Sequence, residues 1–156
     1  MSEFSLPRST IPARLQLTQG DARPGEIYVM ERVPHHDGLE TVLEILNRPE
    51  GFFAFRPANP DGVLLVSKAH TVSLAVDRQP PISDPARLSA ARSQAFEVTL
   101  ARGASLNGWA NIELPRHHAR VLDYLNASTQ PFFAVSSSQE THYVNRAHVL
   151  YARPVD

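Results

Sequence analysis

Residues 42–55 read Val-Leu-Glu-Ile-Leu-Asn-Arg-Pro-Glu-Gly-Phe-Phe-Ala-Phe, and residues 121–135 read Val-Leu-Asp-Tyr-Leu-Asn-Ala-Ser-Thr-Gln-Pro-Phe-Phe-Ala-Val, with one residue inserted. Further along, residues 66–70 (Val-Ser-Lys-Ala-His) correspond to residues 144–148 (Val-Asn-Arg-Ala-His). Ten positions are identical in the two copies: Val42/Val121, Leu43/Leu122, Leu46/Leu125, Asn47/Asn126, Phe52/Phe132, Phe53/Phe133, Ala54/Ala134, Val66/Val144, Ala69/Ala147 and His70/His148. Self-similarity of this kind predicts one small structural unit that occurs twice.

The repeat divides a chain of 156 residues, which would otherwise be taken for one domain, into two units of roughly 75 residues. Units of this size are near the lower limit for an independent hydrophobic core, so we expect the halves to pack on each other. The predicted organisation is a flexible arm at 1–13, a first repeat at 14–77, a Pro-rich linker at 78–94 and a second repeat at 95–156.

The composition predicts a soluble cytoplasmic protein. Hydrophobic residues make up 42% of the chain, and the formal net charge is −1. Cysteine is absent, which excludes disulfides and fits a reducing compartment, and no secretory signal or membrane-spanning run is visible. The charge is uneven: residues 1–77 hold 7 basic and 10 acidic residues, net −3, whereas residues 78–156 hold 8 and 6, net +2. This asymmetry would suit docking of one half on the other, but the favoured alternative is that these surface charges are simply solvated.

Short strands dominate both copies. Alternating or β-branched and aromatic segments bounded by Gly and Pro predict strands at 14–18, 26–33, 52–55, 63–66 and 71–76 in the first copy, and at 96–101, 109–114, 132–135, 141–144 and 149–153 in the second. One short helix precedes the Phe-rich strand of each copy, and in the second copy it covers 121–125.

The helix of the first copy has an apolar face at Leu39, Val42, Leu43 and Leu46, which follow helical spacing. Asp37 and Glu40 predict a capping box at its start. Asn47 and Asn126 are predicted to close the two helices in a left-handed backbone conformation, which asparagine tolerates.

Each copy therefore has the order strand, strand, short helix, strand, strand, with a fifth strand where the His-containing turn divides the last segment. Short antiparallel strands with one short helix predict a mainly β protein built from small half-open β-barrels of the SH3-like or Sm-like kind. We expect two such barrels in tandem, related by a pseudo-twofold axis. The helix would close one mouth of each barrel, and the Phe pair would line its core.

The second copy resembles a family of short uncharacterised bacterial proteins that carry an Arg-Leu-x-Asp-x-Leu-Asn helix followed by a Phe-rich strand. The residues that carry the resemblance are Gly108 to Pro115, Arg-Val-Leu-Asp-Tyr-Leu-Asn at 120–126, Phe-Phe-Ala-Val at 132–135 and Val-Asn-Arg-Ala-His-Val at 144–149. It implies an Sm-like barrel and no particular activity or ligand. The first copy departs from the pattern, since Thr41 stands in place of Arg120 and Glu44 in place of Asp123.

Histidine is frequent, with seven in the chain, and two pairs precede the two helices: His35-His36 and His117-His118. Imidazole is a common ligand of transition metals, so facing pairs would suit Zn, Ni or Cu. Two features weigh against a metal site: the pairs are three residues out of register, and adjacent side chains on an extended chain point in different directions. The alternative is solvated or hydrogen-bonded loop histidines, and we expect no cofactor.

The repeated turn places a basic residue two positions before a histidine in each copy, Lys68 before His70 and Arg146 before His148. These four residues are the sequence candidates for binding an anion or for lining a groove between the halves. The alternative is a tight turn whose histidine satisfies backbone carbonyls.

No serine elbow, carboxylate pair or phosphate-binding Gly-rich loop is present, so we expect no enzyme. The sequence favours a non-catalytic interaction or scaffold module that binds a protein partner or a small ligand at the seam or along sheet edges. Alternatives are nucleic-acid binding by analogy with Sm-like proteins, against which the net charge weighs, and a His-based metal-binding protein. We expect no membrane partner, and either a monomer with pseudo-dimeric halves or a homodimer.

Overall fold

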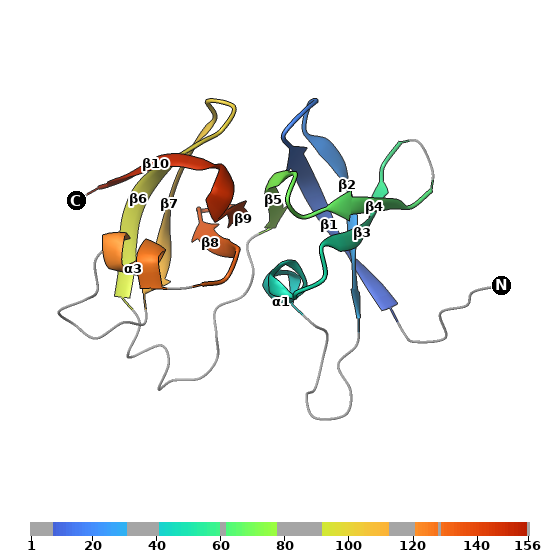
Figure 1. Ribbon diagram of the computed structural model, residues 1–156, viewed down its shortest axis with the longest axis horizontal. Helices are drawn as coiled ribbons and strands as arrows, with labels where there is room; N and C mark the ends of the chain where they lie inside the picture. Colours follow the sequence, from blue (N-terminus) through green and yellow to red (C-terminus); the bar gives the residue numbers. More distant parts are fainter. Residues whose placement is uncertain are drawn as a thin grey trace, which may run out of the picture. The chain divides into compact units, whose positions relative to one another are not determined.

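The computed structural model describes residues 8–30, 41–59, 62–77, 92–112, 121–127 and 129–155. The chain divides into two compact units, Met1–Val76 and Asp77–Asp156, hereafter unit 1 and unit 2 (Figure 1). As predicted, the fold is mainly β, with antiparallel strands and short helices.

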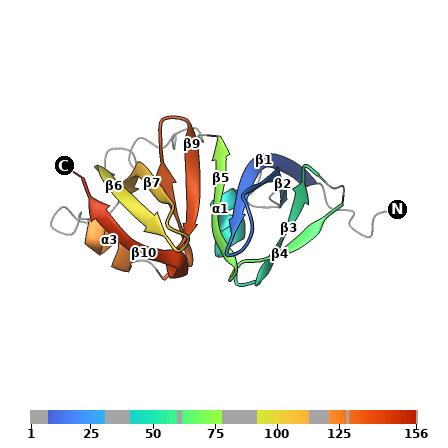
Figure 2. The same cartoon turned by 90° about the horizontal axis from the view of Figure 1, so that it is seen from above.

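Unit 1 contains one antiparallel sheet in the strand order β5-β1-β2-β3-β4. Its elements are β1 (Arg8–Leu17), β2 (Arg23–Met30), α1 (Val42–Asn47), β3 (Phe52–Pro57), β4 (Leu64–Ser67) and β5 (Thr71–Asp77). The first strand therefore lies between the second and the last, and among the described residues of unit 1 the sheet does not close on itself. Figure 2 shows β4 beside β3, at one edge of this sheet.

Unit 2 has the strand order β10-β6-β7-β8-β9, which repeats the connectivity of unit 1. Its elements are β6 (Arg92–Leu100), β7 (Ser105–Ile112), α3 (Val121–Ala127), β8 (Phe132–Ser136), β9 (Glu140–Asn145), the 3₁₀ turn η2 (Arg146–His148) and β10 (Val149–Pro154). The helix again precedes the Phe-rich strand, and η2 stands at the position of the predicted His turn.

Each unit has a core of its own. In unit 1, fully buried side chains come from the sheet and from α1, and include Leu15, Ile27, Leu46, Phe55 and Leu74. In unit 2 they include Phe96, Val98, Phe132, Val135 and Val144. The prediction that the Phe pair lines the core is right for unit 2, where both rings are buried, and wrong for Phe52 of unit 1, which is exposed.

The first strand of each unit begins earlier than the sequence predicts, β1 at Arg8 and β6 at Arg92. Residues 8–13, predicted as arm, and residues 92–94, predicted as linker, therefore belong to strands. Pro12 suggested a loose arm, yet it pairs with Glu26 of β2. The ladder between β1 and β5 starts only at Ala13, so at Pro12 strand β1 has a single described neighbour, β2. The N–H that proline lacks is therefore not needed for a hydrogen bond to β5.

Helix α1 begins at a capping box other than the predicted one. Thr41 Oγ1 accepts a hydrogen bond from Glu44 N (3.2 Å), and Thr41 N donates to Glu44 Oε1 (3.1 Å). The predicted box, Asp37 with Glu40, lies outside the described residues. Both pairs have the spacing of a capping box, so the sequence pattern alone did not distinguish them.

Two glycines recur five residues apart in each unit and have the same roles. Gly20 and Gly103 have φ of 84° and 85°, the left-handed region that a side chain disfavours, in the first hairpin turn. Gly25 and Gly108 lie where the next strand approaches closely: a Cβ on Gly25 would be 2.3 Å from Arg56 O, and one on Gly108 would be 2.2 Å from Ser136 O. These glycines fix the hairpin and the strand spacing in both units.

A register shift also recurs where the last strand pairs with the first. Leu17 and Gln16 pair with Thr71 and Ser73, which leaves Val72 as the additional residue. In unit 2 the shift between β6 and β10 falls between Val149 and Tyr151. Both shifts follow the His turn directly, so each bends the last strand at the same point.

Tyr143 of β9 is expected to make the free energy of unfolding fall at alkaline pH. Burial raises its pKa to about 12, whereas the unfolded phenol titrates near 10. The stabilisation is therefore complete below pH 10 and is lost as pH rises towards 12, because only the unfolded chain releases the proton there. We expect the free energy of unfolding to fall by about 2 to 3 kcal/mol over this window, and Tyr143→Phe to remove this loss.

Urea unfolding at several pH values between 9 and 12 measures this effect. Tyr151→Phe is the matched control, since Tyr151 is exposed on β10, and it should follow the wild-type pH dependence. An equally steep alkaline loss in the Tyr143→Phe variant would show that another group is responsible.

Candidate functional site

Lys68, the first sequence candidate for binding a ligand, closes helix α1. The residue comes directly after β4 in the chain and is only 8% exposed. The Nζ atom donates hydrogen bonds to Ile45 O (2.7 Å) and Arg48 O (3.2 Å). These carbonyls lie at the C-terminal end of α1, where a positive charge is favourable. The structure thus gives Lys68 a structural partner inside its own unit.

Arg146 has the same role in unit 2. Its Nη1 donates to Leu125 O in α3 (2.5 Å), and its Nε donates to Gln130 O just after the helix (2.8 Å). The guanidinium also lies 4.9 Å from the centre of the Phe133 ring. A cation from the turn after the fourth strand therefore binds the end of the helix in both units.

This arrangement replaces the predicted asparagine caps. The described residues contain no residue other than glycine with positive φ, so the predicted left-handed conformation of Asn47 and Asn126 is wrong. The residue after α1, Arg48, is extended, with φ of −66° and ψ of 157°. Pro49 accounts for this, because a proline disfavours helical conformation in the residue before it. The carbonyls at the helix ends instead accept hydrogen bonds from the side chains of Lys68 in unit 1 and Arg146 in unit 2.

His70 and His148 make equivalent backbone hydrogen bonds in the two units. His70 O accepts a hydrogen bond from Thr18 N (3.0 Å), and His148 O accepts one from Ala101 N (2.8 Å), each donor coming directly after the first strand of its unit. The side chain of His70 is exposed and that of His148 is half-buried. These carbonyl contacts fasten the His turn to the first hairpin.

The four histidines considered for a metal site, His35, His36, His117 and His118, lie outside the described residues. Within the described ranges, no group of three or more His, Cys, Asp or Glu side chains is arranged to hold a metal ion.

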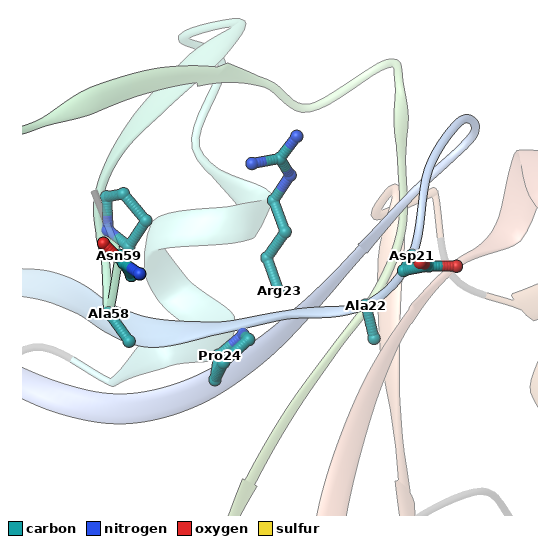
Figure 3. Close-up of a pocket in the computed structure, with 7 residues that line it drawn as sticks. Asp21, Ala22, Arg23, Pro24, Ala58 and Asn59 are labelled. Carbon is teal, nitrogen blue, oxygen red and sulfur yellow. The ribbon is translucent and has the colours of Figure 1, made fainter.

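Unit 1 also has a hollow of about 410 Å³ between the β1–β2 turn and the end of β3. Figure 3 shows the Arg23 side chain extending into the space between the turn that carries Asp21 and the segment that carries Asn59. A backbone hydrogen bond from Ala58 N to Pro24 O (2.9 Å) joins two of the residues that line it. The charged groups at its rim are solvent-exposed, which makes the hollow a weak site for any small ligand.

Unit 1 exposes a group of large apolar side chains around β4. We call this group the β4 edge, and it consists of Phe52, Val63, Leu64 and Leu65. Leu65 is 75% exposed and Phe52 is 62% exposed. Leu65 is paired with Ala54, and Phe52 lies two residues before Ala54, so the two large side chains are diagonal neighbours on one face of the β3–β4 ladder. Among the described strands of unit 1, β4 pairs with β3 alone.

The corresponding positions of unit 2 are buried. Tyr143 corresponds to Leu65 and is 5% exposed, and Phe132 corresponds to Phe52 and is 2% exposed. Thr141, which corresponds to Val63, is buried as well. The residues on this face of the ladder are thus buried in unit 2 and exposed in unit 1.

The reverse holds for the last strand. Leu150 and Tyr151, with Val155 beyond the strand, are exposed and form what we call the β10 edge. In unit 1 the corresponding strand β5 is buried along six consecutive residues, and Val72, which corresponds to Leu150, is 1% exposed against 62% for Leu150. In unit 2, β10 pairs with β6 and with no other described strand.

The sequence analysis predicted binding along sheet edges but did not name the residues of the β4 edge or the β10 edge. One signal was present: residues 63–66 form an uninterrupted apolar run, Val-Leu-Leu-Val, whereas their counterparts 141–144 are Thr-His-Tyr-Val. The segment of unit 2 thus includes residues with polar groups, whereas the segment of unit 1 has only aliphatic side chains.

Comparison with protein-family models, curated proteins and solved structures finds no match to this chain. None of the helices in the described ranges combines the length and apolar character needed to cross a membrane. Functional inference therefore depends on the surfaces above.

Proposed function

We propose that this chain is a non-catalytic interaction module made of two tandem small half-open barrels, SH3-like or Sm-like, that arose by duplication. The strand order, with the first strand between the second and the last in each unit, supports this architecture. The recurring glycines, register shifts and helix-closing cations support the duplication. The Sm-like family resembled by the second copy is consistent with both.

The site of interaction is the β4 edge, and its ligand is an extended segment of a protein. The single observation that carries this proposal is the coincidence of exposed Phe52 and Leu65 with a strand that has one described neighbour in its unit. A partner strand would hydrogen-bond to the main-chain side of β4 that faces no described strand of unit 1, and its side chains would cover the apolar face. A protein is favoured over a small ligand because an edge offers length and main-chain groups rather than enclosure.

Leu65→Arg is expected to weaken partner binding at least tenfold. It replaces the most exposed leucine of the edge with a charge that must be desolvated, and loss of one buried leucine alone corresponds to about 1.5 to 3 kcal/mol. The measurement is the amount of protein captured from a lysate of the producing cells by the immobilised full chain, with and without nuclease treatment.

Leu122→Arg is the matched control, because Leu122 is 62% exposed on α3, outside the proposed site. Its capture should equal that of the wild type. If both variants capture the same proteins as the wild type, the β4 edge is not the site. If the chain captures nucleic acid that nuclease removes together with all protein, the nucleic-acid alternative replaces this proposal.

A further inference from the structure

We infer that the partner of the β4 edge is the β10 edge of a second copy of this chain, so that copies associate head to tail. This inference rests on the proposed function and names its partner. Three observations support it: the apolar side chains exposed on both edges, the lack of protection on the β4 edge, and the opposite charges of the two halves.

The first observation is that both edges expose apolar side chains on consecutive residues. Val63, Leu64 and Leu65 are exposed at the β4 edge, and Leu150 and Tyr151 are exposed at the β10 edge. Consecutive residues of a regular strand point to opposite faces, so β4 is exposed on both faces at Leu64 and Leu65. Both edges therefore offer apolar surface that a further strand would cover.

The second observation is that the β4 edge lacks the devices that keep edge strands apart. Natural edge strands usually carry charged residues, prolines or bulges that block pairing with another chain. Residues 63–67 contain neither a charge nor a proline. In β10, Arg153 lies beside Glu97 of its own unit, with Nε and Oε1 3.9 Å apart, so its charge is partly balanced. Strand β10 carries two such devices, a register shift between Val149 and Tyr151 and Pro154 at its end, so the lack of protection applies to β4 alone.

The third observation selects an unlike pair of edges over a like pair. Residues 1–77 carry a net charge of −3 and residues 78–156 a net charge of +2. Pairing of β4 with β10 brings a negative half against a positive half, which favours encounter. Pairing of β4 with β4 would bring two negative halves together. The unlike contact also leaves one edge of each type free at the ends, so it produces rings or open chains rather than closed pairs.

Two single substitutions, used separately and together, test this inference. Leu65→Arg blocks the β4 edge and leaves β10 open, whereas Leu150→Arg blocks the β10 edge and leaves β4 open. We expect the wild type to form dimers and larger species in sedimentation velocity at increasing concentration, with self-association weakened at least tenfold in either variant. An equimolar mixture of the variants should form a 1:1 dimer and nothing larger, because one complementary pair of edges remains.

Leu122→Arg serves again as the exposed-leucine control and should assemble as the wild type does. Circular dichroism verifies that each variant is folded, and Leu65→Gln with Leu150→Gln replaces any variant that is not. Self-association of Leu150→Arg alone, or failure of the mixture to form a dimer, would overturn the head-to-tail arrangement.

A wild-type chain that stays monomeric throughout the concentration range would overturn the inference as well. It would leave the proposed function intact if Leu65→Arg still abolished the capture of other proteins. If neither assembly nor capture depended on Leu65, both proposals would fail. The two results are therefore distinguishable with the same set of variants.

Discussion

Gly25→Ala is expected to destabilise unit 1 by about 3 to 5 kcal/mol, the largest effect of any single substitution considered. The added Cβ would lie 2.3 Å from Arg56 O and 2.7 Å from Cζ of Phe55. The first atom belongs to the backbone of β3, where Gly25 pairs with Pro57. The second belongs to a ring that is fully buried. Neither can move without loss of the β2–β3 ladder or of core packing.

Urea unfolding followed by circular dichroism measures this loss, and hydrogen exchange assigns it to the amides of β2 and β3. Gly51→Ala is the control, because a Cβ at that position would meet nothing within 4 Å and its φ is not positive. We expect it to change stability by less than about 0.5 kcal/mol. Gly108→Ala should reproduce the large loss in unit 2. Equal stabilities of Gly25→Ala and Gly51→Ala would contradict the close approach.

Lys68→Met is expected to cost about 2 to 4 kcal/mol, since it removes two hydrogen bonds that a charged donor makes to Ile45 O and Arg48 O. Methionine keeps most of the aliphatic stem, so the loss reports on the ammonium group rather than on packing. The effect should appear first at α1, where Ile45 O loses the bond from Nζ and keeps the one from Arg48 N. Hydrogen exchange at α1 and β4, together with urea unfolding, measures it.

Two further variants interpret the result. Arg23→Met removes a positive charge at an exposed position of the same unit and should be nearly neutral in stability. Arg146→Met should weaken α3 as Lys68→Met weakens α1, because it loses the bonds to Leu125 O and Gln130 O. If Lys68→Met were as stable as Arg23→Met, Lys68 would not support the helix, and its part in ligand binding would become the better explanation.

The hydrophobic pattern was sufficient to predict the type and order of the elements. The helices before the Phe-rich strands, the turn at the histidines and the mainly β class are all as predicted. The element boundaries were less predictable. Strand β1 extends over Pro12 because strand pairing is a backbone interaction, and the hydrophobic pattern does not record how many neighbours a strand has.

The candidate site was predicted less well, for a physical reason. The recurrence of Lys68 and Arg146 correctly indicated a shared role, but only the folded chain shows that each cation reaches a helix end 20 or more residues earlier. The open β4 and β10 edges depend on which surfaces remain uncovered after folding. A sequence specifies that Leu65 is apolar, whereas its exposure is a property of the tertiary structure.

The burial of Lys68 has a chemical consequence, because this residue is the single lysine of the chain. In the folded protein, amine-directed reagents, and enzymes that attach groups to lysine, meet this side chain in a buried position. Acylation at residue 68 requires the ammonium group to leave the carbonyls of α1 and lose its proton. Its rate is therefore a built-in probe of how often α1 detaches from unit 1, readable from the mass of one peptide.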